Sequence, residues 1–123
     1  MEYKNTIFIN VTPHFIIFRC QDGSEFELLP SGYLVNAKPV EETVSVICGI
    51  EFVSTRFQGD LEGVRIIQEI KDSILEKKNI LIIGSIVAAQ AYPGQVVAMT
   101  PAPGYERVPV DQKRMNPDKF TIF

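Results

Sequence analysis

The sequence predicts an α+β domain built on a mostly antiparallel sheet or small barrel, with one main amphipathic helix, a short second helix and an extended C-terminal arm. Three observations predict this class. Strand-like runs fill the chain before residue 60, apolar residues recur at helical spacing just after it, and half of the 8 prolines follow residue 99. The 123 residues are expected to form one domain, with a body over residues 1–99 and an arm over residues 100–123.

Strand signals dominate the first half of the chain. Apolar residues alternate along residues 6–11, and Asp22-Gly23 supplies the pair of positive φ angles that a tight hairpin turn favours. Strands are expected at residues 6–11, 15–20, 25–29, 33–37, 44–47 and 51–57. Because six of the 8 phenylalanines precede residue 60, this half is expected to carry the main sheet.

The apolar spacing changes after Gly59. Apolar residues recur every three or four positions from Val64 to Ile74, which predicts an amphipathic helix over residues 61–77. Asp60 is the expected N-cap, and Lys77-Lys78 suits the negative end of the helix dipole.

The remaining body is expected to hold a buried strand, a short helix and a further strand, at residues 80–83, 86–91 and 95–99. The arm contains four prolines, but aromatic residues are spaced through it, so an ordered extended segment is expected. Residues 120–123 are expected to return and pair or pack, on the same chain or on a neighbouring subunit. The exposed aromatics of the arm favour a homo-oligomer assembled through it.

Composition excludes several classes of function. A formal net charge of −3 argues against general nucleic-acid binding. The two cysteines, Cys20 and Cys48, cannot form a disulfide scaffold and are expected to be buried reduced thiols. The first five residues do not resemble a signal peptide, and the longest apolar stretch, residues 80–89, is too short to span a membrane. A cytoplasmic protein is expected, with no metal and no cofactor.

His14 is the single histidine and follows Asn10-Val11-Thr12-Pro13. Histidine is the usual general base at neutral pH, but no serine or cysteine nucleophile motif accompanies it, so no catalytic residue is assigned and an enzyme is not expected. The favoured interpretation is a polar bend that ends a strand, and the alternative is a ligand-binding histidine.

Ser85 lies where the buried strand is expected to meet the short helix. Ordinary helix capping is the favoured interpretation. The alternative is that Ser85 helps to hold an anion, although the glycine-rich patterns of nucleotide-binding loops are absent.

Charge is unevenly distributed along the chain. Residues 20–62 hold eight acidic and two basic residues, a net charge of −6, whereas residues 104–119 hold four basic and three acidic residues, a net charge of +1. The arm is therefore expected to dock on the acidic body in the same chain or across a dimer. Alternatively, Arg107, Lys113 and Arg114 contact phosphate groups and Tyr105 stacks on a base, as a nucleotide-like ligand would require.

Several short motifs resemble a known family. They are Asn10-x-Thr12-Pro13-His14, Pro30-Ser31-Gly32, Gly59-x-x-x-Gly63, Ser85-Ile86-Val87-Ala88 and Ala91-x-Pro93. Their order and spacing over residues 5–95 resemble the small "NLTPH"-type proteins of bacteriophages, prophages and bacterial genomes. The long helix after Gly63 and the Pro-rich arm depart from that pattern, and the family offers no established catalytic residues to transfer.

Together these features predict a non-enzymatic phage or prophage protein that binds a small ligand. In size, and in the setting that the family resemblance implies, the chain resembles small phage-encoded oligomers that sequester nucleotide-type immune signalling molecules. The resemblance therefore implies an anti-defence sponge in the bacterial host cytoplasm, with such a molecule as its expected ligand. The predicted ligand-binding residues are His14, Ser85, Tyr105, Arg107, Lys113 and Arg114. The alternative is a protein-interaction module that inhibits a host enzyme or serves as a phage accessory protein.

Overall fold

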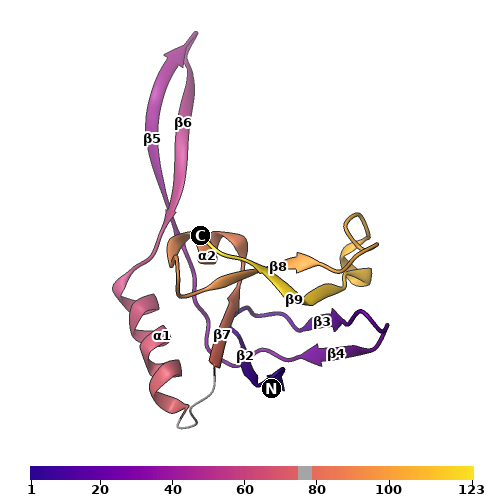
Figure 1. Ribbon diagram of the computed structural model, residues 1–123. Coiled ribbons are helices and arrows are strands. Elements are labelled where there is room, and N and C mark those ends of the chain that lie inside the picture. Colours follow the sequence, from indigo (N-terminus) through magenta and orange to yellow (C-terminus); the bar gives the residue numbers. More distant parts are fainter. Residues whose placement is uncertain (75–78) are drawn as a thin grey trace.

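Figure 1 shows a computed structural model of the chain, which describes residues 1–74 and 79–123. Seven strands form one curled, half-open sheet in the order β1-β2-β7-β8-β9-β3-β4, and two more strands form a separate hairpin. The strands of the sheet are β1 (Glu2–Tyr3), β2 (Thr6–Asn10), β3 (Ile16–Arg19), β4 (Glu25–Leu28), β7 (Asn79–Gly84), β8 (Val97–Pro101) and β9 (Met115–Thr121). The hairpin is β5 (Lys38–Ile47) and β6 (Ile50–Gln58), and the helices are α1 (Leu61–Ser73), α2 (Ile86–Ala91) and the 3₁₀ turn η1 (Val110–Gln112).

The α+β class is confirmed, but the sheet is not mostly antiparallel. Strands β2–β7, β7–β8 and β3–β9 pair in parallel, whereas β1–β2, β3–β4 and β8–β9 pair antiparallel. The prediction that the first half carries the main sheet holds for β1, β2, β3 and β4, whereas β7, β8 and β9 come from the second half. The chain reaches β7 from β2 by a long crossover that includes α1, and such a connection allows parallel pairing.

Local signals place most of the early elements correctly. Strands β3 and β4 form the expected hairpin around Asp22-Gly23, where Gly23 has a φ of 87°. The strand expected at residues 33–37 does not form, although Val35 is buried and its N–H donates to the Val11 carbonyl. Strand β8 begins two residues later than expected, because the N–H groups of Gln95 and Val96 both donate to the Tyr92 carbonyl and close a turn there.

Helix α1 begins as predicted and ends earlier. The Asp60 carboxylate accepts the Gly63 N–H at 2.8 Å, which confirms the N-cap. The helix ends at Ser73 rather than residue 77, because Ile74 is extended at the C-cap position; residues 75–78, including Lys77-Lys78, lie outside the described residues. Val64 is exposed because the buried face of the helix runs through Gly63, Ile67 and Ile70.

Two apolar clusters occupy the two faces of the sheet. The first joins α1 and α2 to one face and contains Val11, Val35, Ile67, Ile70, Ile82, Ala88, Ala89, Tyr92, Val96 and Ala98. The second fills the inside of the curl and contains Phe8, Ile16, Phe18, Leu28 and Ile83. Neighbouring residues of β7, such as Ile82 and Ile83, belong to different clusters because side chains alternate across a strand.

The C-terminal arm is ordered and belongs to the sheet of its own chain. Strand β9 lies between β8 and β3, and the Phe120 ring meets Phe8 edge-on with centroids 5.7 Å apart. The Thr100 hydroxyl also donates to the Lys119 carbonyl at 2.8 Å. Strand β9 pairs with β8 along much of its length but with β3 only at Met115. The predicted assembly through this arm stays a prediction.

The β5–β6 hairpin stands away from the rest of the molecule (Figure 1). Its two-residue turn, Cys48-Gly49, has φ angles of 52° and 76°, as the tight turn between twisted strands requires. Cys48 is therefore exposed at the end of the hairpin, and the expectation that both cysteines are buried is wrong.

Candidate functional site

A hydrogen-bonded turn after β2 positions His14. The fully buried Asn10 side chain donates to the His14 carbonyl at 2.7 Å and accepts from both the N–H and the hydroxyl of Thr12, at 2.9 and 2.7 Å. The His14 N–H in turn donates to the Thr12 hydroxyl oxygen at 3.3 Å. These hydrogen bonds satisfy polar backbone groups of Thr12 and His14. The His14 side chain itself is exposed.

A second motif, 21 positions further along the chain, supports the same turn. The Ser31 hydroxyl and N–H both donate to the Asn10 carbonyl, at 2.6 and 3.0 Å. The Ser31 oxygen also accepts the Tyr33 N–H at 3.2 Å. The motifs around Asn10 and Ser31 therefore form one structural unit at the carboxyl end of β2.

Ser85 lies beside this turn. Strands β2 and β7 are parallel, with Asn10 paired to Ile83, so their carboxyl ends lie at the same edge of the sheet. The Ser85 hydroxyl oxygen accepts the Ala88 N–H at 3.1 Å and caps α2. The capping interpretation is thus confirmed, and the hydroxyl proton remains available for a second hydrogen bond because capping uses the oxygen as an acceptor.

An open groove of about 870 Å³ begins at this edge and extends to the arm. Its polar lining is Thr12, His14, Asn36, Ser85, Asp111 and Lys113, and its apolar lining is Pro13, Phe15, Ile16, Ile17, Pro30, Met99, Val110 and Met115. Three of the predicted ligand-binding residues, His14, Ser85 and Lys113, therefore line one groove although they lie up to 99 positions apart in the chain.

The other three predicted residues do not line this groove. Arg114 forms an ion pair with Glu25 at 3.0 Å, and Arg19 reaches the same carboxylate at 2.9 Å. The pKa of Glu25 is lowered, mainly by the hydrogen bond from Arg19. Burial opposes this shift, and the contact with Arg114 adds to it. The Tyr105 ring lies 5.6 Å from the Arg19 guanidinium, and Arg107 is exposed. The arm thus docks through Arg114 on an acidic residue of its own body.

Sequence reasoning missed several groove residues. Phe15 is 60% exposed, whereas the next residue, Ile16, is buried, so the strand pattern turns the Phe15 ring outward beside His14. The alternation of exposed and buried residues could have predicted from the sequence that Phe15 faces outward. Asn36 lies in a loop and Asp111 lies in η1, and neither carries a local signal because the whole fold decides where these segments lie.

Tyr92 joins the groove to the helices and to the base of the hairpin. Its hydroxyl accepts the Asp60 N–H at 3.0 Å and lies 3.4 Å from the Asn36 carbonyl oxygen. A Cβ on Gly59 would lie 2.5 Å from the Tyr92 ring, and one on Gly63 would overlap its hydroxyl oxygen. Burial is the main cause of the raised pKa of Tyr92. The Gly59-x-x-x-Gly63 and Ala91-x-Pro93 segments therefore meet around one buried ring.

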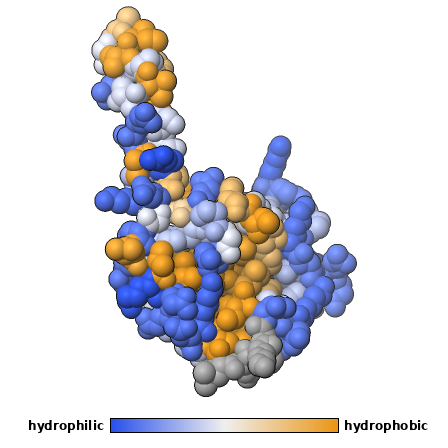
Figure 2. Space-filling view, turned by 60° about the vertical axis from the view of Figure 1, so that its left-hand side comes forward, coloured by the Kyte–Doolittle hydropathy of each residue, from blue (hydrophilic) through white to orange (hydrophobic). Residues whose placement is uncertain are grey.

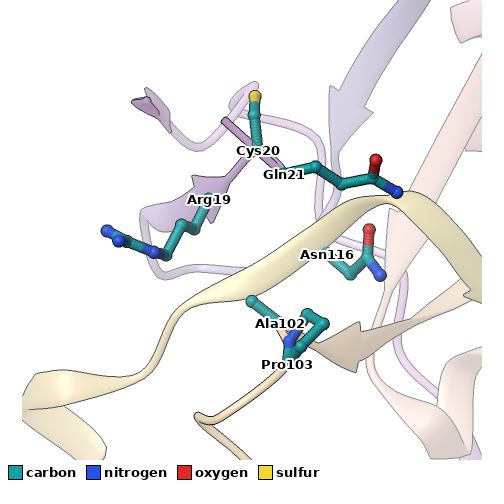
Figure 3. Close-up of a pocket in the computed structure, with 6 residues that line it drawn as sticks. All are labelled: Arg19, Cys20, Gln21, Ala102, Pro103 and Asn116. Carbon is teal, nitrogen blue, oxygen red and sulfur yellow. The ribbon is translucent and has the colours of Figure 1, made fainter. Parts of the chain in front are cut away.

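A smaller pocket of about 310 Å³ lies where β3 and β9 diverge, and Figure 3 shows the six residues that line it. The Arg19 guanidinium extends away from the side on which the Gln21 and Asn116 amide groups lie, so the charged group and the amides do not converge on a common point (Figure 3). Arg19 is also engaged by Glu25. This pocket is a weaker candidate than the groove, where polar groups from four segments face one space.

Two other kinds of site are absent from residues 1–74 and 79–123. No group of three or more His, Cys, Asp or Glu side chains could hold a metal ion in this part of the chain. No described helix is long and apolar enough to cross a membrane.

No family model matches the sequence, and neither a characterised protein nor a solved structure matches it. The resemblance to the NLTPH-type family therefore stays a prediction.

Proposed function

We propose that this chain is a non-enzymatic binding protein for a nucleotide-type small molecule, which it holds in the groove between the β2 turn, Ser85 and η1. One observation carries the proposal. His14, Ser85 and Lys113, which are separate in the sequence, line a single groove with apolar walls.

The lining suits each part of a nucleotide. Lys113 can contact a phosphate as a point charge, with His14 and the Ser85 hydroxyl as additional donors. Asp111 and Asn36 supply oxygen acceptors for sugar hydroxyls or a base amino group. The exposed Phe15 ring offers a flat surface for a base. A bare phosphate would leave the apolar walls unused.

Size also supports an organic ligand. Small-molecule sites are mostly apolar clefts of roughly 300–1,000 Å³ with a few convergent polar groups. The groove, at about 870 Å³, falls in the upper part of that range. Binding without turnover is proposed because the Ser85 hydroxyl oxygen accepts the Ala88 N–H in the helix cap and no cysteine lines the described groove. In a phage setting, such binding would sequester a signalling nucleotide.

The first experiment is thermal unfolding with 3′,5′-cyclic nucleotides, ADP-ribose and cyclic ADP-ribose. A ligand at about 100 times its Kd adds about 2.7 kcal/mol of stability. For a domain of this size that corresponds to roughly 10 °C in Tm. The compound is then recovered and analysed by chromatography, and it is expected to be unchanged.

Variants locate the site. Lys113→Ala should raise the Kd by about tenfold or more, since hydrogen bonds to charged groups contribute about 1.5–3 kcal/mol. Lys119→Ala removes the same charge from the same arm outside the groove lining and should leave the Kd unchanged. An equal change of the Kd in the two variants would contradict the assigned site. Recovery of a reaction product would overturn the non-enzymatic proposal, and no Tm shift with any compound would overturn nucleotide binding.

A further inference from the structure

The groove holds two charged side chains whose charges cancel. Lys113 and Asp111 both line it, and with His14 counted as neutral the formal charge of the lining is zero. Neither side chain forms an ion pair, either with the other or with any further described residue. Both charged groups are therefore available to a ligand in the groove.

The 3₁₀ turn η1 holds both side chains in one short segment. Asp111 lies within the turn, and Lys113 follows it at the C-cap position. The Gln112 N–H donates to the Pro109 carbonyl at 2.9 Å and closes the turn. Because the ammonium and the carboxylate belong to residues only two positions apart, a ligand group bound to Lys113 has its neighbouring groups near Asp111.

The described lining offers no second cation to further phosphates. It contains no arginine, and Lys113 is its only lysine. Arg19 and Arg114 instead share the Glu25 carboxylate, at 2.9 and 3.0 Å, outside the groove. A nucleoside triphosphate would bring several negative charges to one lysine and one carboxylate, and like charges repel. The charge balance therefore favours a ligand with one negative charge.

The Asp111 carboxylate favours a particular group beside the phosphate. An ionised carboxylate accepts hydrogen bonds and donates none, so its partner in the ligand must be a donor. In a nucleotide the nearest donors to the phosphate are the ribose hydroxyls, and dinucleotide-binding folds bind the ribose 2′-hydroxyl with an acidic residue. A 3′,5′-cyclic ribonucleotide carries one phosphate charge and keeps this hydroxyl.

We infer that the groove is selective for a ribonucleotide with one negative charge, such as a 3′,5′-cyclic mononucleotide. Lys113 binds the phosphate, and Asp111 accepts the hydrogen bond of the 2′-hydroxyl and repels additional phosphates. The inference rests on the proposed function, because it concerns the ligand of the same groove. It makes Asp111 the residue that determines specificity, whereas Lys113 supplies affinity.

The projecting hairpin is a competing surface for a nucleobase. Figure 2 shows hydrophobic residues gathered at the end of the hairpin, with hydrophilic residues along its stalk. Phe52 of the hairpin is 49% exposed and Phe15 of the groove is 60% exposed, so an exposed ring is present at both places. Phe15→Ala should raise the nucleotide Kd by at least about fivefold, as loss of base stacking does, and Phe52→Ala should leave it unchanged. An equal response to the two changes would overturn the assignment to the groove.

The main test is isothermal titration calorimetry with matched nucleotides. The adenine series contains cyclic AMP, 2′-deoxy cyclic AMP, AMP and ATP, and a guanine series has the same four forms. In the series that binds more tightly, the cyclic ribonucleotide should have the lowest Kd. Each added negative charge should raise the Kd by about fivefold, and removal of the 2′-hydroxyl should raise it by about tenfold or more.

Asp111→Asn tests the source of this selectivity. The amide keeps an oxygen acceptor and removes the charge, so the ratio of the triphosphate Kd to the cyclic nucleotide Kd should fall by at least about fivefold. The preference for the 2′-hydroxyl should also become smaller, because hydrogen bonds to neutral groups are weaker. Glu106→Gln removes the same charge from the same arm outside the groove lining and should leave both preferences unchanged. Circular dichroism checks that each variant is folded.

Failure of the inference is distinguishable from failure of the proposed function. Binding that tightens with the number of phosphates, or that is equal with and without the 2′-hydroxyl, would overturn the inference and leave nucleotide binding intact. Unchanged preferences in Asp111→Asn would do the same. An absence of binding in both series would also overturn the inference, and the thermal panel with ADP-ribose then decides the proposed function separately.

Discussion

Gly63→Ala tests the packing that joins the hairpin base, α1 and the groove. The glycine lies in the first turn of α1, where its missing side chain leaves room for the Tyr92 hydroxyl. A Cβ at this position would overlap the Tyr92 oxygen and lie 2.9 Å from Cε1, whereas ordinary contact begins at 3.4 Å. The buried ring must therefore move, and its hydrogen bond from the Asp60 N–H at 3.0 Å must lengthen or break.

Two opposing effects set the size of the change. Replacing glycine by alanine inside a helix favours folding by about 1 kcal/mol. Forcing a buried aromatic ring out of its site, with the loss of a hydrogen bond, costs about 3 kcal/mol. The net expectation is a loss of about 2 kcal/mol in the free energy of unfolding, or roughly 8 °C in Tm.

Urea unfolding of Gly63→Ala measures the effect directly. Gln68→Ala, on the exposed face of the same helix, is the control and should change the free energy by less than about 0.5 kcal/mol. In a Tyr92→Phe background the cost of Gly63→Ala should fall by about 1 kcal/mol, because the nearest clashing atom is gone. A Gly63→Ala protein as stable as the wild type would refute the reasoning.

Three further predictions concern stability. Asn10→Ala should lower the free energy of unfolding by about 3 kcal/mol, because the Thr12 and His14 backbone groups lose buried partners; a loss below about 1 kcal/mol in urea would contradict this. Cys48→Asn should be neutral or slightly stabilising in thermal unfolding, since asparagine tolerates positive φ better than cysteine, and a clear drop in Tm would speak against the turn. The pKa values of Glu25 and Asp118 are lowered, mainly by hydrogen bonds from Arg19 and Lys4, so folding gains stability above their unfolded pKa near 4 and loses it as the pH falls further. Urea titrations at pH 7 and pH 3 check that loss, and equal midpoints would exclude it.

Local chemistry made much of the fold predictable. The Asp60 cap, the Asp22-Gly23 hairpin turn and the buried strand after Asn79 each depend on a few adjacent residues. Strand partners were not predictable, because the parallel pairing of β2 with β7 depends on how a crossover of nearly 70 residues packs. The projection of the hairpin was equally hidden, since β-branched runs look alike whether a sheet covers them or solvent does.

In the candidate site, too, the chemistry of single residues could be predicted from the sequence, whereas their arrangement in space could not. His14, Ser85 and Lys113 could be selected individually from their chemistry, but their shared groove follows from strand order. Arg114 carried the same signal as Lys113, yet it contacts Glu25, which lies 89 positions earlier in the chain. The residues next to a charged side chain in the sequence do not indicate whether its partner is a ligand or a distant carboxylate.

The most direct test of the central claim is a two-dimensional ¹⁵N NMR titration of the labelled protein with the nucleotide that gives the largest Tm shift. The proposed function predicts that the amide signals of Thr12, His14, Ser85 and Lys113 move together and saturate at one Kd. Signals near Arg107 and Tyr105 should stay in place. Shifts concentrated around those two residues, or an unchanged spectrum, would contradict nucleotide binding in the groove.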